Sequence, residues 1–355
     1  KNKVNYCKKK LKFPFISFLF ISVDNLIMFY IILVLIVVAI IGIPLIFWVQ
    51  PHKQIDSLEK LHIVITGGSS GIGKALAIEA VKSRANVSLL ARNKAKLESA
   101  RKEVEKHKVF EEQEIKTFCA DVTDYNQLTL VLSEVESVDI LINCAGMAKA
   151  ELFEENLSTY QKLMDLNYFG SVNTTFYFLP KMKTKRFGHI VLISSMAGQL
   201  GIFGYAGYSA SKFALRGLAE SLLMEVRPYG IGVSVAFPPD TDTPGFEEEN
   251  KDKPEETQLI SASAGVYSPS AVAKDILNGV QGGKFLISSG MDGLLLNILT
   301  CGASPASSRL ELLMQAFLMG IIRLVMTVYS FNHHKIAADG EKKRRSAVPE
   351  KEKES

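Results

Sequence analysis

The stretch LHIVITGGSSGIGKALAIEAVKS, residues 61–83, decides the fold of this chain. It begins with an apolar, strand-like run and ends, from Lys74 to Ser83, with a run of helical character. The glycine-rich turn between them lets the backbone approach a pyrophosphate, and the start of the helix offers it unpaired N–H groups. Because the turn has a strand before it and a helix after it, the stretch predicts a dinucleotide-binding unit rather than an ordinary turn.

Apolar runs of strand length recur along the chain after this point, and helical stretches separate them. The strand candidates are residues 61–66, 86–91, 115–120, 138–143, 188–195, 231–237 and 284–289. Strands that alternate with helices in this way form a parallel sheet covered by helices on both faces. The sequence therefore predicts an α/β fold, with a single Rossmann-type doubly wound parallel sheet of about seven strands in one domain over residues 60–290.

The two ends of the chain carry much of its apolar content, which reaches 47% overall. Residues 26–49 contain no charged side chain and are long enough to cross a bilayer, and Trp48 stands where an interfacial aromatic residue would lie. We therefore expect a transmembrane anchor over residues 26–49, preceded by a basic N-terminal extension over residues 1–25.

A second apolar region covers residues 291–331, and Arg323 interrupts it. It is consistent with a second membrane span, with an amphipathic helix lying on the membrane, or with a helix that forms a homo-oligomer. The two membrane-associated interpretations are favoured. Residues 332–355 are rich in charge and predict a disordered tail.

Composition excludes several classes of function. The net charge of +4 comes largely from basic residues near the two termini, so nucleic-acid binding is not expected. Cys7, Cys119, Cys144 and Cys301 form no CxxC pair and no metal-ligand spacing with histidine, so no metal site is expected. Cys119 and Cys144 lie in apolar runs, which predicts buried, reduced thiols and a domain that faces a reducing compartment.

Three positions at the ends of predicted strands indicate the cofactor. Arg92 follows the second strand, where NAD-binding proteins carry an acid for the ribose 2′-hydroxyl, and an arginine there can pair with a 2′-phosphate. We therefore expect NADPH rather than NADH. Asp121 follows the third strand, where it can reach the adenine edge or simply cap a turn. Asn143 begins the Asn-Cys-Ala-Gly run after the fourth strand, whose small residues permit close approach to the cofactor.

Four residues have the pattern of a proton-transfer site. Tyr208 and Lys212 are spaced i and i+4, so they share one face of a helix. The nearby cation is expected to lower the pKa of the phenol, which makes Tyr208 a proton donor to a developing alkoxide. Ser195 ends the fifth strand, where its hydroxyl can bind the substrate oxygen. Asn167 is a poor helix former inside a predicted helix, which indicates a special role.

Taken together, TGGSSGIG, NCAG, Asn167, Ser195 and YSASK resemble the short-chain dehydrogenase/reductase family, and the resemblance covers roughly residues 60–290. It implies that Tyr208 is the general acid and that Lys212 tunes it and holds the cofactor ribose. It also implies that Ser195 orients a ketone and that Asn167 supports a water-linked proton relay. The same resemblance implies that this domain binds a nicotinamide cofactor.

The expected cofactor site follows from the glycine turn, the strand ends and this resemblance. Pro238-Pro239 departs from the Pro-Gly that is usual after the sixth strand, and the extra proline stiffens the loop. Thr243 nevertheless matches the threonine that, in this family, contacts the amide group of the nicotinamide. The expected cofactor-binding residues are Gly67, Ser69, Ser70, Gly71, Ile72, Gly73, Arg92, Asp121, Val122, Asn143, Ala145, Gly146, Tyr208, Lys212, Pro238 and Thr243.

Residues 198–222 and 237–250 are similar to a narrower group within the family, the reductases of sphingoid-base synthesis. This similarity implies NADPH-dependent reduction of a long-chain keto-lipid, which an enzyme held at the bilayer by apolar ends would meet there. We also expect residues 240–256 to border the substrate entrance, with Asp240, Asp242 or the acidic run 247–249 attracting an amine.

Two alternatives to this function stay open at this point. One is another membrane-bound reductase of the family, acting on a steroid, a retinoid or a long-chain 3-ketoacyl-CoA. The other is a membrane scaffold that keeps the nucleotide fold without catalysis, although the presence of all four proton-transfer residues argues against it.

Location in the cell is suggested by weaker signals. Residues 351–355, KEKES, resemble the K-x-K-x-x retrieval signal, which predicts the endoplasmic reticulum membrane with the catalytic domain facing the cytosol. Six lysines before residue 13 oppose this orientation by the positive-inside tendency. A translation start at Met28 would remove those lysines and the conflict with them.

Overall fold

The computed structural model describes residues 54–262 and 265–347, together with scattered positions between Met28 and Val49. The chain divides into two compact units, Lys1–Gln50 and Pro51–Ser355. In the first unit, Met28–Tyr30 are helical. The predicted basic extension and most of the predicted anchor over residues 26–49 lie outside the described residues, so the account that follows concerns the second unit.

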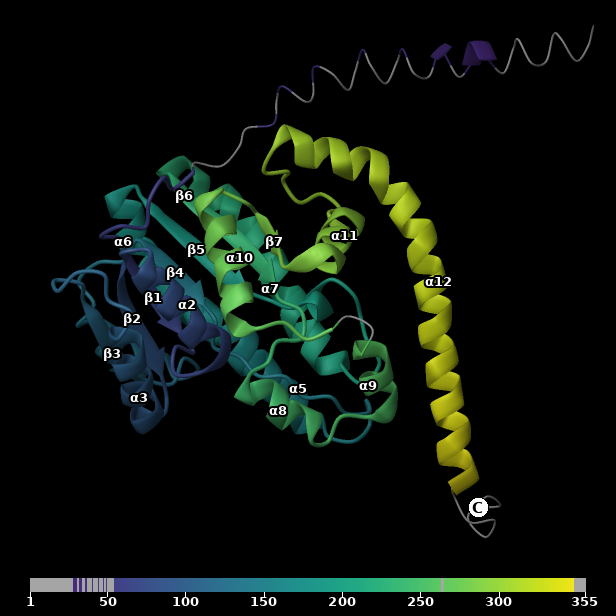
Figure 1. The fold of residues 1–355 in the computed structure, drawn as a ribbon, viewed down its shortest axis with the longest axis horizontal. Coiled ribbons are helices and arrows are strands. Elements are labelled where there is room, and N and C mark those ends of the chain that lie inside the picture. The colour runs from purple at the N-terminus through teal and green to yellow at the C-terminus, as the bar shows by residue number, and fades with distance from the viewer. Residues whose placement is uncertain are drawn as a thin grey trace, which may run out of the picture. The chain divides into compact units, whose positions relative to one another are not determined.

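A seven-stranded parallel sheet forms the centre of this unit, in the order β3-β2-β1-β4-β5-β6-β7 (Figure 1). The strands are β1 (His62–Thr66), β2 (Asn86–Ala91), β3 (Ile115–Cys119), β4 (Ile140–Asn143), β5 (Gly188–Ile193), β6 (Ile231–Phe237) and β7 (Leu286–Ser288). Each lies within one of the seven predicted runs, so the doubly wound α/β fold is confirmed.

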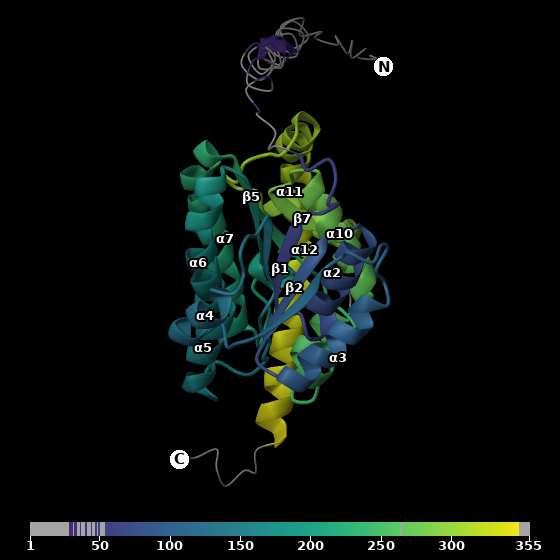
Figure 2. The same cartoon turned by 90° about the vertical axis from the view of Figure 1, so that its left-hand side faces the viewer.

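Helices cover both faces of the sheet, as Figure 2 shows. Alternate residues of a strand point to opposite faces. Ile63 and Ile65 of β1 therefore pack in one core, and Val64 packs in the other. The first core is completed by α2 (Gly71–Lys82), α3 (Lys94–Glu105) and α10 (Pro269–Gln281), and the second by α4 (Tyr125–Leu132), α6 (Gly170–Lys185) and α7 (Ala206–Val226).

The topology places a crevice at one edge of the sheet. β1 pairs with β2 on one side and with β4 on the other, in a register that sets Thr66 opposite Asn143. After β1 the chain continues to β2 on one side of this point, and after β4 it continues to β5 on the other side. Ligands of open α/β sheets bind outside the carboxyl ends of the strands at such a switch point.

Shorter elements follow the carboxyl ends of the later strands. They are α5 (Leu157–Leu163), a π-helical segment (Met164–Phe169), a 3₁₀ turn (Met196–Gly198) after β5, a second 3₁₀ turn (Arg227–Tyr229), α8 (Pro244–Asn250) and α9 (Glu255–Ser261). The π-helical segment, the turn after β5, α8 and α9 each contribute residues to the wall of the cavity described below.

Two helices complete the described chain, α11 (Gly290–Thr300) and α12 (Arg309–Ala347). α12 packs against α11 and α9 and runs along the side of the unit (Figure 1). Its segment Arg309–Ser346 is long and apolar enough to cross a membrane, and among the described residues it is the one helix with that property.

The predicted disordered tail from residue 332 is wrong for the residues that the structure describes, because α12 continues to Ala347. Basic residues near its end pair with the acidic first turn of α9: Lys343 lies 2.6 Å from Glu255, and Arg344 pairs with Glu256. These ion pairs give the charged segment partners that the sequence pattern did not reveal. Residues 348–355 lie outside the described residues.

The cysteine prediction is only partly correct. Cys144 is partly buried and Cys301 is buried, but Cys119 is exposed. Cys119 is the last residue of β3, the edge strand of the sheet, and its thiol donates to the Arg92 carbonyl at 3.4 Å. Cys7 lies outside the described residues.

Candidate active site

The glycine turn after β1 is shaped to receive a ligand close to the backbone. Gly67 has a φ of 69° and Gly71 a φ of 52°, which favour glycine. A Cβ atom at Gly73 would overlap the carbonyl oxygen of Gly67, and one at Gly67 would lie 2.9 Å from Cα of Ala145. Ser70 makes no side-chain capping bond, so the N-terminus of α2 stays open to the crevice. A pyrophosphate fits this backbone cradle.

Thr66 joins the ends of β1 and β4. Its hydroxyl accepts hydrogen bonds from the N–H groups of Cys144 and Ala145, each at 3.0 Å. The run from Cys144 to Gly146 is thereby fixed against the glycine turn. Burial raises the pKa of the Cys144 thiol to about 12, so this cysteine stays protonated and unreactive.

A single cavity of about 920 Å³ extends from the glycine turn to the catalytic residues. Most of the predicted site lines it: Gly67, Ser69, Ser70, Gly71, Ile72, Gly73, Arg92, Val122, Ala145, Gly146, Ser195, Tyr208, Lys212, Pro238 and Thr243. Asp121, Asn143 and Asn167 do not line it. Asp121 and Asn167 contact residues that do, Arg92 and Met147 respectively.

The side chain of Asn143 joins a strand end to a helix. Its side chain is buried, donates to the Thr175 hydroxyl at 3.0 Å and accepts from the Thr174 hydroxyl. Both partners lie on α6, so the side chain fastens the end of β4 to that helix. The side chain is thus engaged with α6, and the cofactor contact expected of Asn143 stays a prediction.

The end of the cavity beside β2 carries positive charge. Arg92 is 64% exposed at its side chain and lies 3.4 Å from the Asp121 carboxylate, a long ion pair that leaves most of the guanidinium accessible. Burial tends to raise the pKa of Asp121, but hydrogen bonds from Thr123 and the charge of Arg92 lower it. Lys96, which the sequence analysis missed, also lines this end.

Tyr208 and Lys212 lie one turn apart on α7 and both face the cavity. Lys212 is 6% exposed, and its Nζ donates a hydrogen bond to the Ile193 carbonyl at 2.9 Å. The same nitrogen lies 5.8 Å from the centre of the Tyr208 ring. Ser195 caps the 3₁₀ turn after β5 and shares a hydrogen bond with Tyr208. The predicted proton-transfer residues are therefore brought together.

The charge state of this group differs from the sequence prediction. Burial raises the pKa of the Tyr208 phenol, and the hydrogen bond with Ser195 opposes this only in part. Burial also lowers the pKa of the Lys212 ammonium to about 8. The expected lowering of the Tyr208 pKa by Lys212 is not found here, because desolvation dominates. The phenol is consequently protonated at neutral pH and can donate a proton.

Asn167 holds two parts of the site together. It is fully buried in the π-helical segment, accepts from the Met147 N–H at 2.9 Å and donates to the Met147 carbonyl at 3.0 Å. Its amide also donates to the Ser211 hydroxyl at 2.9 Å. It therefore ties the loop after β4 to α7. π-Helical turns are often found at functional sites, which fits the unusual position of this residue.

The proline pair after β6 is fixed against the catalytic turn. The Pro238 carbonyl accepts from the Met196 N–H at 3.1 Å, and the Pro239 carbonyl accepts from the Thr241 hydroxyl at 2.8 Å. Thr243 then caps α8 by accepting from the Phe246 N–H at 3.1 Å. Residues of this segment line the cavity, and their predicted place at the substrate entrance stays a prediction.

A buried ion pair, which the sequence analysis missed, lies behind the predicted proton donor. Tyr205 packs against Tyr208 with ring centres 5.3 Å apart, and its hydroxyl donates to Glu249. Glu249 in turn lies 2.8 Å from Lys253, and their side chains are only 9% and 2% exposed. The i, i+4 spacing of this pair was the signal that could have revealed it.

Apolar side chains from the C-terminal helices form the far wall of the cavity. Leu295 and Leu296 come from α11, and Ile322, Val325, Met326 and Tyr329 come from α12. The α12 residues recur at helical spacing on one face. The sequence analysis expected this region to be membrane-associated and did not predict that it lines the site.

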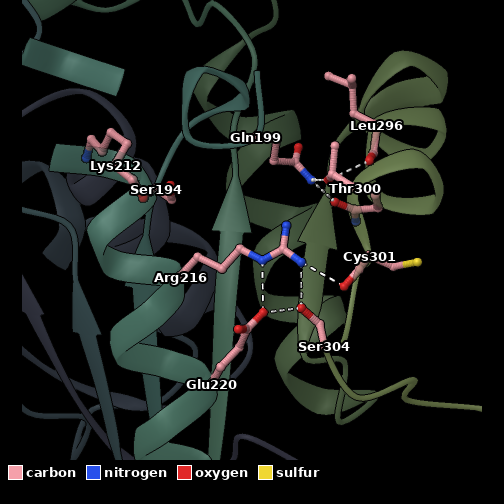
Figure 3. A network of polar contacts seen from close by, with 10 residues as sticks. Ser194, Gln199, Lys212, Arg216, Glu220, Leu296, Thr300, Cys301 and Ser304 are labelled. Carbon is pink, nitrogen blue, oxygen red and sulfur yellow. Dashed lines mark hydrogen bonds and ion pairs between the residues drawn. The ribbon is translucent and has the colours of Figure 1, made fainter. Parts of the chain in front are cut away.

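Polar contacts hold α11 in this position, as Figure 3 shows. Arg216 of α7 donates to the Cys301 carbonyl and to the Ser304 hydroxyl, each at 2.7 Å, and lies 3.0 Å from Glu220. Gln199, in the loop after the catalytic turn, donates to Asn297 of α11 at 2.7 Å. The C-terminal part of α11 and the loop that leads to α12 are therefore attached to α7 and to the loop after β5.

The described part of the chain contains no cluster of three or more histidine, cysteine or acidic residues that could hold a metal ion.

Known proteins share this sequence and fold. The sequence model of the family described as short chain dehydrogenase matches residues 61–254. The chain is 48% identical over 279 residues to 3-ketodihydrosphingosine reductase from Bos taurus, covering 77% of this chain and 84% of that protein. It is also 48% identical over 278 residues to 3-dehydrosphinganine reductase from Danio rerio, with the same coverage.

Solved structures are similar as well. A short-chain dehydrogenase from Streptomyces avermitilis superimposes with a TM-score of 0.57 at 28% identity, over 67% of this chain and 90% of that one. A short-chain dehydrogenase from Sphingobium yanoikuyae in complex with NADPH gives a TM-score of 0.57 at 25% identity, over 64% of this chain and 87% of that one.

Proposed function

The chain belongs to the short-chain dehydrogenase family of oxidoreductases, and from this premise we propose that it reduces 3-ketodihydrosphingosine to dihydrosphingosine with NADPH. The relatives at 48% identity carry the name of this activity and match most of the chain. The observation that supports the substrate best is the cavity, which joins Tyr208 to an apolar wall built by α11 and α12.

The shape of the cavity suits an amphiphilic ketone. The proposed substrate carries its carbonyl, an amine and a hydroxyl at one end and a long hydrocarbon chain at the other. The polar end fits beside Ser195 and Tyr208, and the chain fits along the α12 face that includes Val325 and Tyr329. Burial of a methylene group contributes about 0.8 kcal/mol, so an apolar wall of this kind favours a long chain.

The nicotinamide cofactor, when bound, supplies the hydride for reduction of the carbonyl carbon. The glycine turn and the open N-terminus of α2 would hold its pyrophosphate. The accessible guanidinium of Arg92, assisted by Lys96, suits a 2′-phosphate and supports NADPH. Thr243 would lie beside the nicotinamide, although its hydroxyl is already committed to capping α8.

Proton transfer is assigned to residues of the chain itself. The Tyr208 hydroxyl donates a proton to the carbonyl oxygen, and the Ser195 hydroxyl orients that oxygen by a hydrogen bond. Cationic Lys212 stabilises the phenolate that remains, because its Nζ lies close to the ring. Asn167 positions α7 and the loop after β4. The proton relay implied for Asn167 remains a proposal.

We also propose a membrane location, with a division of the chain into an anchor at 26–49, a reductase domain at 60–290 and a membrane-associated region at 291–331. The outward side of α12 supports this, since Phe317, Leu324 and Val328 are exposed there. We place the protein in the endoplasmic reticulum with its catalytic domain in the cytosol. Protease treatment of sealed microsomes tests the orientation: a domain that survives until detergent is added would contradict it.

The direct test of the reaction is NADPH consumption with 3-ketodihydrosphingosine in detergent micelles, with mass detection of the product. A steroid ketone, a retinal and a long-chain 3-ketoacyl-CoA serve as competing substrates. We expect turnover of the sphingoid ketone to exceed that of the others. Preferred turnover of a competitor would replace the proposed substrate, and no turnover of any ketone would overturn the proposed reaction.

A further inference from the structure

Asp240 carries a carboxylate that the protein itself does not use. It follows the proline pair after β6 and lines the cavity. Its backbone is held by Tyr267, whose N–H donates to the Asp240 carbonyl at 2.9 Å, and by the bridge between Thr241 and Tyr267. Within the described chain, the carboxylate of Asp240 has no hydrogen bond or ion pair. A fixed backbone thus presents a free carboxylate to the cavity.

The other acidic residues on the cavity wall differ from it. Glu248 pairs with Lys251, Glu249 pairs with Lys253, and Asp252 lies 2.9 Å from Lys149. Asp292 is exposed in the first turn of α11. Asp240 alone among these combines partial burial with the lack of a partner in the described residues.

Its surroundings show what kind of group would complete the site. Burial raises the pKa of Asp240 to about 6; Lys253 opposes this rise and Glu249 adds to it. The charge of Asp240 also acts on the phenols of Tyr205 and Tyr208. A partly desolvated carboxylate without a partner is costly, and a cation placed beside it would remove that cost. The cavity therefore favours a cationic group close to the catalytic phenol.

We propose that Asp240 binds the ammonium group of the substrate and makes the enzyme selective for ketones that carry an amine on the adjacent carbon. This inference rests on the proposed function and names the residue that binds the polar end of the substrate. An ammonium on the carbon next to the carbonyl lies within a few ångströms of the proton donor. Asp240 and Tyr208 then bind two neighbouring groups of one molecule, which also orients the carbonyl.

The test compares two substrates and three enzymes. The substrates are 3-ketodihydrosphingosine and the same long-chain hydroxyketone without its amine. The enzymes are the full-length wild type, Asp240→Asn and Asp242→Asn, where Asp242 is the matched control because it is exposed in the same loop and does not line the cavity. The measured quantity is the ratio of kcat/KM for the amine substrate to kcat/KM for the deaminated one.

We expect Asp240→Asn to lower this ratio about 10- to 100-fold, the range expected for one charge-assisted hydrogen bond, and Asp242→Asn to leave it within about twofold. Asp240→Glu should recover part of the loss, which separates lost charge from lost folding. An unchanged ratio in Asp240→Asn, with a wild type that reduces the amine substrate, overturns the role of Asp240 alone. A wild type that reduces neither ketone overturns the proposed function, and this inference with it.

Discussion

The cofactor end and the substrate end of the cavity are built by different means. At the cofactor end, glycines and strand termini shape the backbone, and few side chains are needed. At the substrate end, apolar side chains of α11 and α12 form the wall, and contacts such as those of Arg216 hold these helices in place. The first end depends on local chain geometry, whereas the second depends on how distant helices pack.

This difference suggests that changes at the two ends should affect different steps. A substitution at the cofactor end should alter cofactor choice for every substrate. A substitution at the substrate end should alter the preference for chain length or head group and leave cofactor binding intact. The catalytic residues between them should affect the chemical step itself.

The largest effect is expected at the junction of the two ends. Tyr208→Phe removes the proton donor, so kcat should fall on the order of 100-fold or more. NADPH affinity should stay nearly unchanged, because the phenyl ring still fills the same space beside Lys212. Steady-state kinetics and cofactor titration by fluorescence measure the two quantities. Turnover close to that of the wild type would refute the assignment of Tyr208 as general acid.

A smaller effect is expected at the cofactor end. Arg92→Asp replaces the accessible guanidinium with a carboxylate, which repels a 2′-phosphate and accepts from a ribose 2′-hydroxyl. The kcat/KM ratio of NADPH to NADH should fall by about tenfold or more, as for loss of a charge-assisted hydrogen bond. Lys94→Asp, on the first turn of α3, is the control for a simple change of surface charge. An equal kcat/KM ratio in the wild type and Arg92→Asp would show that Arg92 does not discriminate between NADPH and NADH.

The substrate end is tested by two valines of α12 on different sides of the helix. Both valines are exposed, at 52% for Val325 and 70% for Val328, but only Val325 lines the cavity. Val325→Asn should raise KM for the long-chain ketone by about three- to tenfold, since it replaces an apolar side chain of the cavity wall that the hydrocarbon chain would cover. The effect on a short-chain ketone should be smaller. If Val328→Asn produces the same change in detergent micelles, α12 does not bind the chain through its inner face.

The smallest effect on turnover is expected from the contacts that hold α11. Arg216→Met keeps the length of the side chain but loses the bonds to the Cys301 carbonyl and the Ser304 hydroxyl. Loss of these bonds should lower stability by about 1–3 kcal/mol, while kcat changes less than about threefold. Thermal unfolding and steady-state kinetics measure both. A large fall in kcat without loss of stability would give Arg216 a role in the site itself.

The fold was predictable because its signals are local. Each of the seven strands lies within a predicted run. A buried strand needs alternating or continuous apolar residues, whichever elements pack against it. The glycine turn was recognised for the same reason: a positive φ at Gly67 and the absence of space for a Cβ at Gly73 demand glycine. The i, i+4 spacing of Tyr208 and Lys212 likewise depends on one helix alone.

Other features depended on neighbours that the sequence does not reveal. Asn143 follows the strand as predicted, but its side chain points to α6 and binds Thr174 and Thr175. The pKa of Tyr208 depends on burial, and burial depends on every element packed around α7. The charged end of α12 stays helical because Glu255 and Glu256 of α9 provide its partners.

By itself, the sequence predicted the order of strands and helices, the glycine turn and the candidate proton-transfer residues, because each of these depends on spacings of a few residues. Only the tertiary structure decided that α12 forms one wall of the cavity and that Asp240 is the half-buried acid of the cavity lining that has no partner among the described residues. Both depend on contacts between segments far apart in the chain. An apolar helix has the same composition whether it faces lipid or a substrate. Whether an aspartate lacks a partner can be judged only when its neighbours in the fold are known.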